Sequence, residues 1–434
     1  SLQIGKFFPK KWGVRIPMYM AISQSNSTPE FDPYELDTEL KPKLDEIRTF
    51  FSSDSAKNYK RSVQEFTQVK SLNFTNMRFQ PERENKDRKK RFYNVENMNF
   101  TYAYTETTNS TPIIEYDKTK LYKGAFAYTY SPKSKPIEPF KNLIGGKNKW
   151  LGLIRDINFN PVPSNLSFRT ELNRKFHETL MRDVFGDGLI DPTFDKSFTW
   201  DRFYGLKWDI TKSIKIDYSA TNKARIDEPL GALDTKAKRD SMWDNFLDFG
   251  RNINYRHTFS VNYNLPTRKI PLLDWTTIRA SYNADYGWQA GSIGIADTLG
   301  NVINNSRSIS INGDLNFTNL YNKSKFLKKH NSSRPPKKAK DKDPPKDEVR
   351  GKDDDKKEEG DEDQDEKNKK KKEPFNVGDF FVRMMLAVRR VSVTYSQNEA
   401  STLPGFMPET QWLGMNTNGW SPGIGYAFGA QPNN

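Results

Sequence analysis

Polar and apolar residues alternate with a period of two along much of this chain. The segment 277–289, TIRASYNADYGWQ, shows the pattern most clearly. Its apolar positions are Ile278, Ala280, Tyr282, Ala284, Tyr286 and Trp288. Its polar positions are Thr277, Arg279, Ser281, Asn283, Asp285 and Gly287. Because successive side chains of a β-strand point to opposite faces, the segment is predicted to be a strand with one apolar and one polar face.

The same pattern predicts about eleven strands in the chain. They are expected within residues 12–23, 69–79, 97–105, 122–130, 165–173, 199–210, 214–220, 255–265, 277–289, 308–318 and 390–396. Pro17 predicts an edge or a bulge in the first of them, because proline cannot donate to the ladder. In the second, Leu72 and Phe74 share one parity while Met77 and Phe79 share the other, which predicts a bulge near Thr75.

The length and composition of these strands favour an outer-membrane barrel. Strands of about 9 to 11 residues or more with aromatic apolar faces are typical of such barrels, whereas strands of soluble proteins have about 5 or 6 residues. Aromatic residues make up 13% of the chain although only 35% of it is hydrophobic. The longest apolar stretch, 380–393, is interrupted by Arg383, Arg389 and Arg390, so a spanning helix is not expected and strands would have to cross. An elongated soluble β-protein, such as an adhesin, is the alternative.

Charge and cysteine content change this picture little. The net charge is +14. Residues 331–374 contain fifteen basic and fifteen acidic residues, so the excess belongs to the patterned part. This insert has almost no apolar residues and is predicted to be disordered, because it cannot bury enough surface to offset the entropy of folding. The chain has no cysteine, which excludes disulfides and thiolate metal sites.

The connections give a further expectation about orientation. The short links 211–213 and 266–274 follow even-numbered strands, whereas 25–66, 177–196, 226–252 and 290–306 follow odd-numbered ones. Outer-membrane barrels place short turns in the periplasm, so the insert is expected there too, with the long link 132–163 as an exception. Residues 235–249 and, less clearly, 36–51 are expected to be partly helical. An odd strand count cannot close an antiparallel barrel, which indicates a piece of a longer protein.

No catalytic or metal site is predicted. The histidines His177, His257 and His330 lack metal-ligand spacing. Asp187, Asp191 and Asp195 could hold calcium, but their spacing differs from that of known loops and turn formation explains them. Basic and aromatic residues are separated by face, which is unlike a nucleic-acid-binding surface. We therefore expect no enzyme activity, no cofactor, no metal and no nucleic-acid partner.

Several stretches resemble the SprA/Sov family, the outer-membrane translocon of the type IX secretion system. They are FFPKKWGVRIPMYMAIS, STPEFDPYELD, SLNFTNMRF, YGLKWDITKSIKIDYSA, YNLPTRKIPLLDWTTIRASYNADYGW and RRVSVTYSQNEASTLPGFMPE. The resemblance covers nearly the whole chain except 331–374. It implies a fragment of a very large barrel in the outer membrane of a Bacteroidetes-type Gram-negative cell, a role in protein secretion and gliding motility, and a wide channel for folded cargo. It also implies a small outer-membrane β-barrel partner and a periplasmic plug.

The expected organisation is thus all-β, with an antiparallel transmembrane barrel segment, long loops and one disordered insert. Residues 1–330 would supply about ten strands with their loops, 331–374 the insert, and 375–434 a further strand and a loop rich in Gly, Pro and Asn. The residues expected to line the lumen are Arg256, Arg279, Asn283, Asp285 and Asp314. The residues expected to face lipid are Phe259, Tyr263, Tyr282, Tyr286 and Trp288. A fragment of a nutrient-receptor barrel is a further alternative.

Overall fold

The computed structural model describes residues 2–80, 91–132, 135–143, 151–183, 188, 190–294, 296–331, 381–382 and 384–432. Except for Asn331, the charged insert predicted at 331–374 lies outside the described residues. The candidate calcium residue Asp187 also lies outside them.

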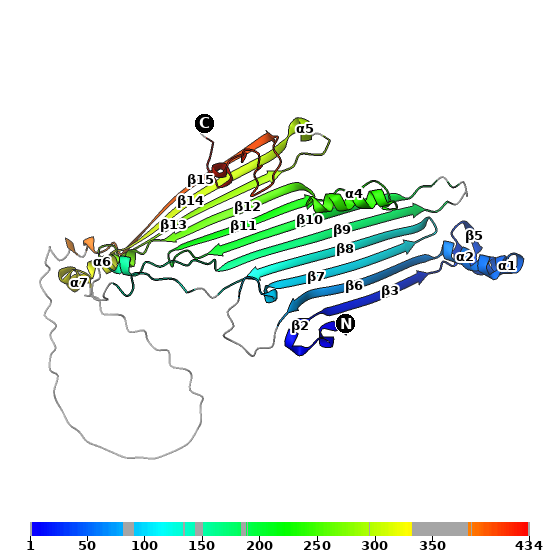
Figure 1. Ribbon diagram of the computed structural model, residues 1–434, viewed down its shortest axis with the longest axis horizontal. Coiled ribbons are helices and arrows are strands. Elements are labelled where there is room, and N and C mark those ends of the chain that lie inside the picture. The colour runs from blue at the N-terminus through cyan, green and yellow to red at the C-terminus, as the bar shows by residue number, and fades with distance from the viewer. Residues whose placement is uncertain are drawn as a thin grey trace, which may run out of the picture. The chain divides into compact units, whose positions relative to one another are not determined.

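One 13-stranded sheet dominates the described residues (Figure 1). Its order is β1-β3-β6-β7-β8-β9-β10-β11-β12-β13-β14-β15, with β2 paired to β6, and every pairing with a defined register is antiparallel. The strands are β1 (Leu2–Gln3), β2 (Val14–Arg15), β3 (Pro17–Ser27), β6 (Glu65–Phe79), β7 (Met98–Ser110), β8 (Ile114–Tyr130), β9 (Asn165–Met181), β10 (Thr193–Trp208), β11 (Ile214–Arg225), β12 (Arg251–Asn264), β13 (Thr276–Gln289), β14 (Asn301–Asn316) and β15 (Arg390–Phe406).

The all-β prediction is therefore confirmed. Each of the eleven strands of the sheet other than the two-residue β1 and β2 overlaps one of the eleven predicted segments, and several extend beyond it. Within the described residues the path runs from β1 to β15 without closing. A transmembrane barrel stays a prediction.

The two predicted irregularities occur where proline and the change of parity place them. The strand is interrupted at Ile16, between β2 and β3 and just before Pro17. The register of β6 against β7 shifts between Phe74 and Met77, and Asn76 has a φ of 53°. The bulge keeps Leu72, Phe74, Met77 and Phe79 on one face, because one extra residue restores the alternation.

Two loops contain helices of 11 or 12 residues. One holds the two-stranded sheet of β4 (Phe31–Asp32) and β5 (Glu35–Glu39), followed by α1 (Leu40–Phe50) and α2 (Ser53–Val63). The other holds α4 (Lys236–Leu247), whose first turn is capped by Thr235, which accepts a hydrogen bond from the Lys238 amide at 3.3 Å. Further helices whose bounds the structure describes are α3 (Gly152–Arg155), α5 (Ala296–Leu299), α6 (Phe317–Tyr321), α7 (Lys325–Asn331), α9 (Ile424–Ala427) and the 3-10 turns η1 (Ile4–Phe7), η2 (Lys10–Trp12), η3 (Val95–Asn97) and η4 (Thr267–Lys269).

The chain divides into two compact units. The first comprises residues 1–265, 279–311 and 395–434, and the second comprises 266–278 and 312–394. In the second unit, the Trp275 ring lies 5.3 Å from that of Phe317, and Lys323 pairs with Asp274 at 2.5 Å.

Link length does not separate the two edges of the sheet in the first unit. The very short link 111–113 between β7 and β8 lies at the same edge as the helical link 226–250 between β11 and β12. The short link 209–213 shares the opposite edge with 131–164. The expected sorting therefore holds for the links 28–64, 226–250 and 209–213 but not for 111–113, because the sequence pattern gave no strand over 106–121. We call the edge with link 111–113 the first edge and the edge with link 209–213 the second edge.

Candidate functional site

The sheet of the first unit has a polar face, which carries the predicted lumen residues of β12 and β13. Polar residues lie opposite polar residues on this face: Thr258 is the register partner of Asp285, and Ser260 is the register partner of Asn283. The Thr258 hydroxyl donates to Asp285 Oδ1 at 2.6 Å. Such cross-strand pairs fix the polar side chains in a row without removing them from water.

The charges on this face are loosely paired. Arg256 lies 3.9 Å from Asp285, and their side chains are 71% and 39% exposed. An ion pair this open and this long contributes little stability. Arg279 lies opposite Asn264 and is exposed. The polar face is therefore open to solvent at these positions.

A shallow depression of about 310 Å³ marks the polar face between β13, β14 and β15. It is lined by Asn283, Asp285, Ser306, Arg307, Ser308, Asn398, Glu399 and Ala400. The structure thus brings together Asn283 and Asp285, two of the predicted lumen residues, with polar residues from two more strands. Asp314 belongs to the second unit, where it accepts hydrogen bonds from Arg390 at 2.9 Å and from Ser392 at 2.6 Å.

The opposite side of the sheet is the aromatic face. Close to the second edge, a row of rings crosses four strands: Phe100, Phe126, Phe168 and Tyr204. Their successive centroid distances are 5.0, 6.3 and 5.3 Å. Phe100 is 41% and Tyr204 is 40% exposed, and Tyr263 is 37% exposed on the same face. Neighbouring rings of this size form an open apolar band rather than scattered surface residues.

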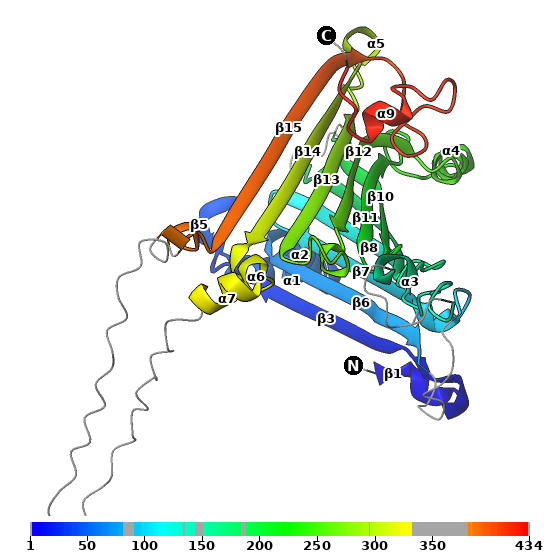
Figure 2. The same ribbon diagram turned by 90° about the vertical axis from the view of Figure 1, so that its left-hand side faces the viewer.

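Toward the first edge, the chain itself covers the aromatic face. The C-terminal segment, residues 407–432, lies over β12, β13 and β14, and α4 lies over β10 on the same side of the sheet (Figure 2). Trp200 stacks on Phe246 of α4 at 5.0 Å and on Phe249 at 5.4 Å. The hydrophobic core of the first unit therefore lies between the sheet and these covering segments.

Two predicted lipid-facing residues are buried beneath the C-terminal segment. Tyr286 is 1% and Trp288 is 2% exposed. The Tyr286 hydroxyl donates to the Gly414 carbonyl at 2.8 Å, and Trp288 Nε1 donates to the Pro408 carbonyl at 3.2 Å. This corrects their predicted lipid-facing position, because protein already occupies the space over both rings. Burying each ring stabilises the arrangement by roughly 2–3 kcal/mol.

The other three predicted lipid-facing residues differ in their surroundings. The Tyr282 hydroxyl donates to the Phe428 carbonyl, and Phe259 packs edge-on against the Phe428 ring at 5.3 Å. Of the five, only Tyr263 is exposed. Alternation identified the apolar face of β12 and β13, but a contact with residues more than a hundred positions away leaves no periodic signal.

A polar chain runs through the covered core. His257 is 1% exposed, and its Nε2 donates to the Ala427 carbonyl at 2.7 Å. Its Nδ1 then accepts from the Tyr255 hydroxyl at 3.2 Å, and Tyr218 lies 3.0 Å from that hydroxyl. This satisfies both ring nitrogens with protein groups. Through the Ala427 carbonyl and the Phe428 ring, the cluster holds the C-terminal segment in place.

The loop at 28–64 contains a buried ion pair that the sequence did not reveal. Asp32 is fully buried and accepts from Lys43 at 2.5 Å, from Tyr59 at 2.5 Å and from the Tyr34 amide at 2.9 Å. Burial alone would raise the pKa of Asp32, but the hydrogen bonds from Lys43, Tyr59 and the Tyr34 amide outweigh it and lower the pKa. Hydrogen bonds with Asp32, Tyr59 and Glu35 outweigh the effect of burial on Lys43 and raise its pKa.

No metal site appears among the described residues. None of their His, Asp and Glu side chains form a group of three that could hold an ion. Asp195 of the candidate calcium loop pairs with Lys175 at 2.7 Å. His177 pairs with Asp117 at 2.9 Å.

The described part of the chain also contains no helix long and apolar enough to span a membrane.

The comparison with known families adds one finding. Residues 1–44 match the SprA_N family model, described as motility related/secretion protein. The match covers β1 to β5 and the start of α1. Among curated proteins, none matches this chain. The match supports a motility- or secretion-related protein, in agreement with the coarser part of the SprA/Sov resemblance.

Proposed function

We propose that this chain forms part of the wall of a protein-conducting channel in the outer membrane, which passes folded cargo proteins to the cell surface in type IX secretion. The observation that carries the proposal is one antiparallel sheet with an exposed polar face on one side and an open aromatic band on the other. The wall of such a channel has a polar face toward the water-filled lumen and an apolar face toward lipid. The match of residues 1–44 to a motility and secretion family supports it.

Strand length supports the same proposal. β8 and β9 each have 17 residues and β10 has 16. At about 3.4 Å per residue and a tilt of about 40°, such strands rise about 40 Å, whereas the apolar band of an outer-membrane barrel is about 25 Å tall. Part of each strand would therefore project beyond the lipid. The covered region near the first edge suits the projecting part, and the open aromatic row suits the lipid-facing part.

A conducting wall also requires closure. Unpaired strand edges are not tolerated in lipid, so β3 and β15 would pair with additional strands to complete the barrel. A wide barrel has a water-filled lumen, because barrel diameter grows roughly linearly with strand number. In this proposal Arg256, Asn283 and Asp285 keep the lumen wall hydrated. The wall contributes no motor or catalysis, and its partners would be cargo, a small outer-membrane β-barrel protein and a periplasmic plug.

Single cysteine substitutions test which face meets water, since the chain has no cysteine of its own. Asn283→Cys on the polar face and Tyr263→Cys on the aromatic face lie on neighbouring strands and form a matched pair. In intact membranes, a membrane-impermeant maleimide should label Asn283→Cys, and trapped cargo should protect it. Tyr263→Cys should be labelled only after denaturation.

Equal labelling of both variants in membranes would contradict the proposal. It would mean that water reaches both faces, as in a soluble adhesin. Labelling of Asn283→Cys that trapped cargo leaves unchanged would support a membrane wall but remove the conducting role of this face.

A further inference from the structure

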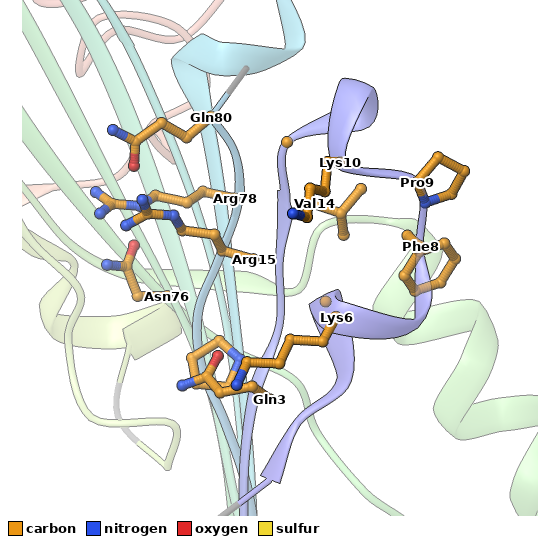
Figure 3. Close-up of a pocket in the computed structure, with 13 residues that line it drawn as sticks. Gln3, Lys6, Phe8, Pro9, Lys10, Val14, Arg15, Asn76, Arg78 and Gln80 are labelled. Atoms are coloured by element: carbon orange, nitrogen blue, oxygen red, sulfur yellow. The ribbon is translucent and has the colours of Figure 1, made fainter. Parts of the chain in front are cut away.

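A pocket of about 740 Å³ lies beside β2, at the second edge of the sheet (Figure 3). Its polar lining consists of Gln3, Lys6, Lys10, Arg15, Asn76, Arg78 and Gln80. The side chains of Asn76, Arg78 and Gln80 from the end of β6 extend to the same side as that of Arg15 (Figure 3). The pocket therefore gathers cationic and amide donors from two separate segments of the chain.

The two arginines occupy directly opposite positions in the ladder. Arg15 is the register partner of Arg78 in the β2–β6 pairing. Like charges in directly opposite positions destabilise a sheet. Within the described residues no carboxylate pairs with Arg15, Arg78, Lys6 or Lys10. Two guanidinium groups in opposite positions repel each other, and an anion bound between them would remove that repulsion.

The backbone around the pocket is built to hold the arginines in place. The Gln80 amide donates to the Gly13 carbonyl at 2.6 Å, and the Ile4 amide donates to the Ile16 carbonyl at 3.0 Å. These bonds fasten the 3-10 turns to β2 and to the end of β6. A Cβ on Gly5 would lie 2.3 Å from the Val14 carbonyl oxygen, so the first turn can approach β2 this closely only with glycine there. The bulge at Asn76 places Arg78 on the polar face of the sheet. Without the extra residue, the alternation would place Arg78 on the aromatic face.

We propose that this pocket binds a phosphate group. Two guanidinium groups side by side present parallel N–H donors, which suit the oxygens of a tetrahedral oxyanion. Lys6 adds a further positive charge, and the amides of Gln3, Asn76 and Gln80 add neutral donors. Phe8 also lines the pocket and stacks on Trp12 at 6.1 Å, with Trp12 60% exposed. The phosphate group could belong to inorganic phosphate or to a lipid headgroup, and the test distinguishes the two.

The test measures binding to the full-length purified protein and does not depend on secretion. Inorganic phosphate is titrated by calorimetry, and vesicles of phosphatidylglycerol are compared with vesicles of phosphatidylcholine. The double variant Arg15→Gln/Arg78→Gln should weaken the binding of inorganic phosphate or of phosphatidylglycerol vesicles about tenfold or more, because it removes both guanidinium groups. Arg15→Lys/Arg78→Lys should give an intermediate loss. The control Arg61→Gln removes an exposed arginine of α2 and should bind like the unaltered protein.

Thermal stability gives a second measurement. Without phosphate, Arg15→Gln/Arg78→Gln should unfold at the same temperature as the unaltered protein or higher, because a like-charge pair is lost. With phosphate, only the protein with both arginines should gain stability. A fall in stability without phosphate would overturn the proposed repulsion.

The probes separate the two sources of phosphate. Arginine-dependent binding of inorganic phosphate supports a soluble ligand, and arginine-dependent binding only to phosphatidylglycerol vesicles supports a headgroup. No binding to either probe, or binding that Arg15→Gln/Arg78→Gln leaves unchanged, overturns the proposal. Because the channel proposal rests on labelling and secretion, each proposal can fail without the other.

Discussion

Side chains on the polar face carry out different tasks from those on the aromatic face. Asn283 and Asp285 lie on an open surface beside Thr258 and Ser306. Tyr286 and Trp288, on the same strand, are buried. Position in the alternating pattern therefore tells which face a side chain is on, and its neighbours from distant segments decide what it contacts.

The polar face offers a direct test of conduction. Asn283→Leu together with Asp285→Leu should reduce secretion several-fold and make cargo accumulate in the periplasm, because two apolar side chains would adhere to passing protein. Secreted and retained cargo are measured by immunoblotting. Asn283→Ser with Asp285→Asn keeps the face polar and should secrete normally. If the leucine variant also secretes normally, this stretch of wall does not contact cargo.

Asp32 makes the loop at 28–64 sensitive to acid. Because the pKa of Asp32 is lowered in the folded protein, its ionised form stabilises the loop at neutral pH, and this stability is lost as pH falls below about 5 through the lowered pKa. The protection of residues 31–63 against hydrogen exchange, corrected for the intrinsic exchange rate at each pH, should fall over that range. In Asp32→Asn the acid dependence should disappear, with about 3 kcal/mol of local stability lost at neutral pH.

The control for this loop is Asp54→Asn. Asp54 pairs with Lys57 on exposed α2, where both side chains are more than half exposed. This variant should keep the acid dependence. If Asp54→Asn and Asp32→Asn behave alike, general charge rather than the buried pair controls the loop.

At the level of elements, the sequence pattern predicted the strands better than it predicted the segments that cover the aromatic face. The bulge near Thr75 was predictable from the change in alternation there, and the interruption before Pro17 was predictable from the proline itself. Helix α4 lies within 235–249, where a partly helical segment was expected. Helix α2 was not predicted, and neither was the docking of the C-terminal segment, because its Gly, Pro and Asn residues have no periodicity.

The docking of the C-terminal segment depends on Gly414. A Cβ at this position would lie 2.4 Å from Tyr286 Cε1 and 2.6 Å from Tyr255 Cδ1, and its φ is +79°. Gly414→Ala should therefore cost about 2–4 kcal/mol and release the segment. Limited proteolysis after residue 406 and a red shift of tryptophan fluorescence, as Trp288 becomes exposed, would report the release.

Gly419→Ala is the matched control for this segment. Gly419 also has a positive φ, +103°, but nothing lies within 4 Å of its Cβ position. This variant should cost about 1 kcal/mol through backbone strain alone and leave the segment docked. Equal release in both variants would mean that backbone strain, rather than the contact with Tyr286 and Tyr255, controls docking.

At the level of the whole molecule, the sheet shows one exposed polar face and one aromatic face that is partly open and partly covered. The aromatic row from Phe100 to Tyr204 is open, while the region around Tyr286 is covered by protein. A soluble protein would be expected to cover both regions, because contiguous exposed rings are unfavourable in water. The open row is therefore the feature that a membrane location explains best.

Cell fractionation tests this location. We expect the protein in the outer-membrane fraction, where it should resist washing with alkaline carbonate and be extracted only by detergent. A soluble or surface-attached adhesin would be released without detergent. Release by carbonate would contradict the proposed membrane wall, whatever the labelling of single cysteines shows.

The sequence by itself determined the strands, their two faces and the bulge in β6, because period-two alternation is a local property that burial on one side imposes on every strand. Tertiary structure alone decided which part of the aromatic face is covered, which carboxylate is buried with Lys43, and which arginines meet across β2 and β6. Those contacts join residues far apart in the chain, and no local pattern records a partner that is distant in sequence.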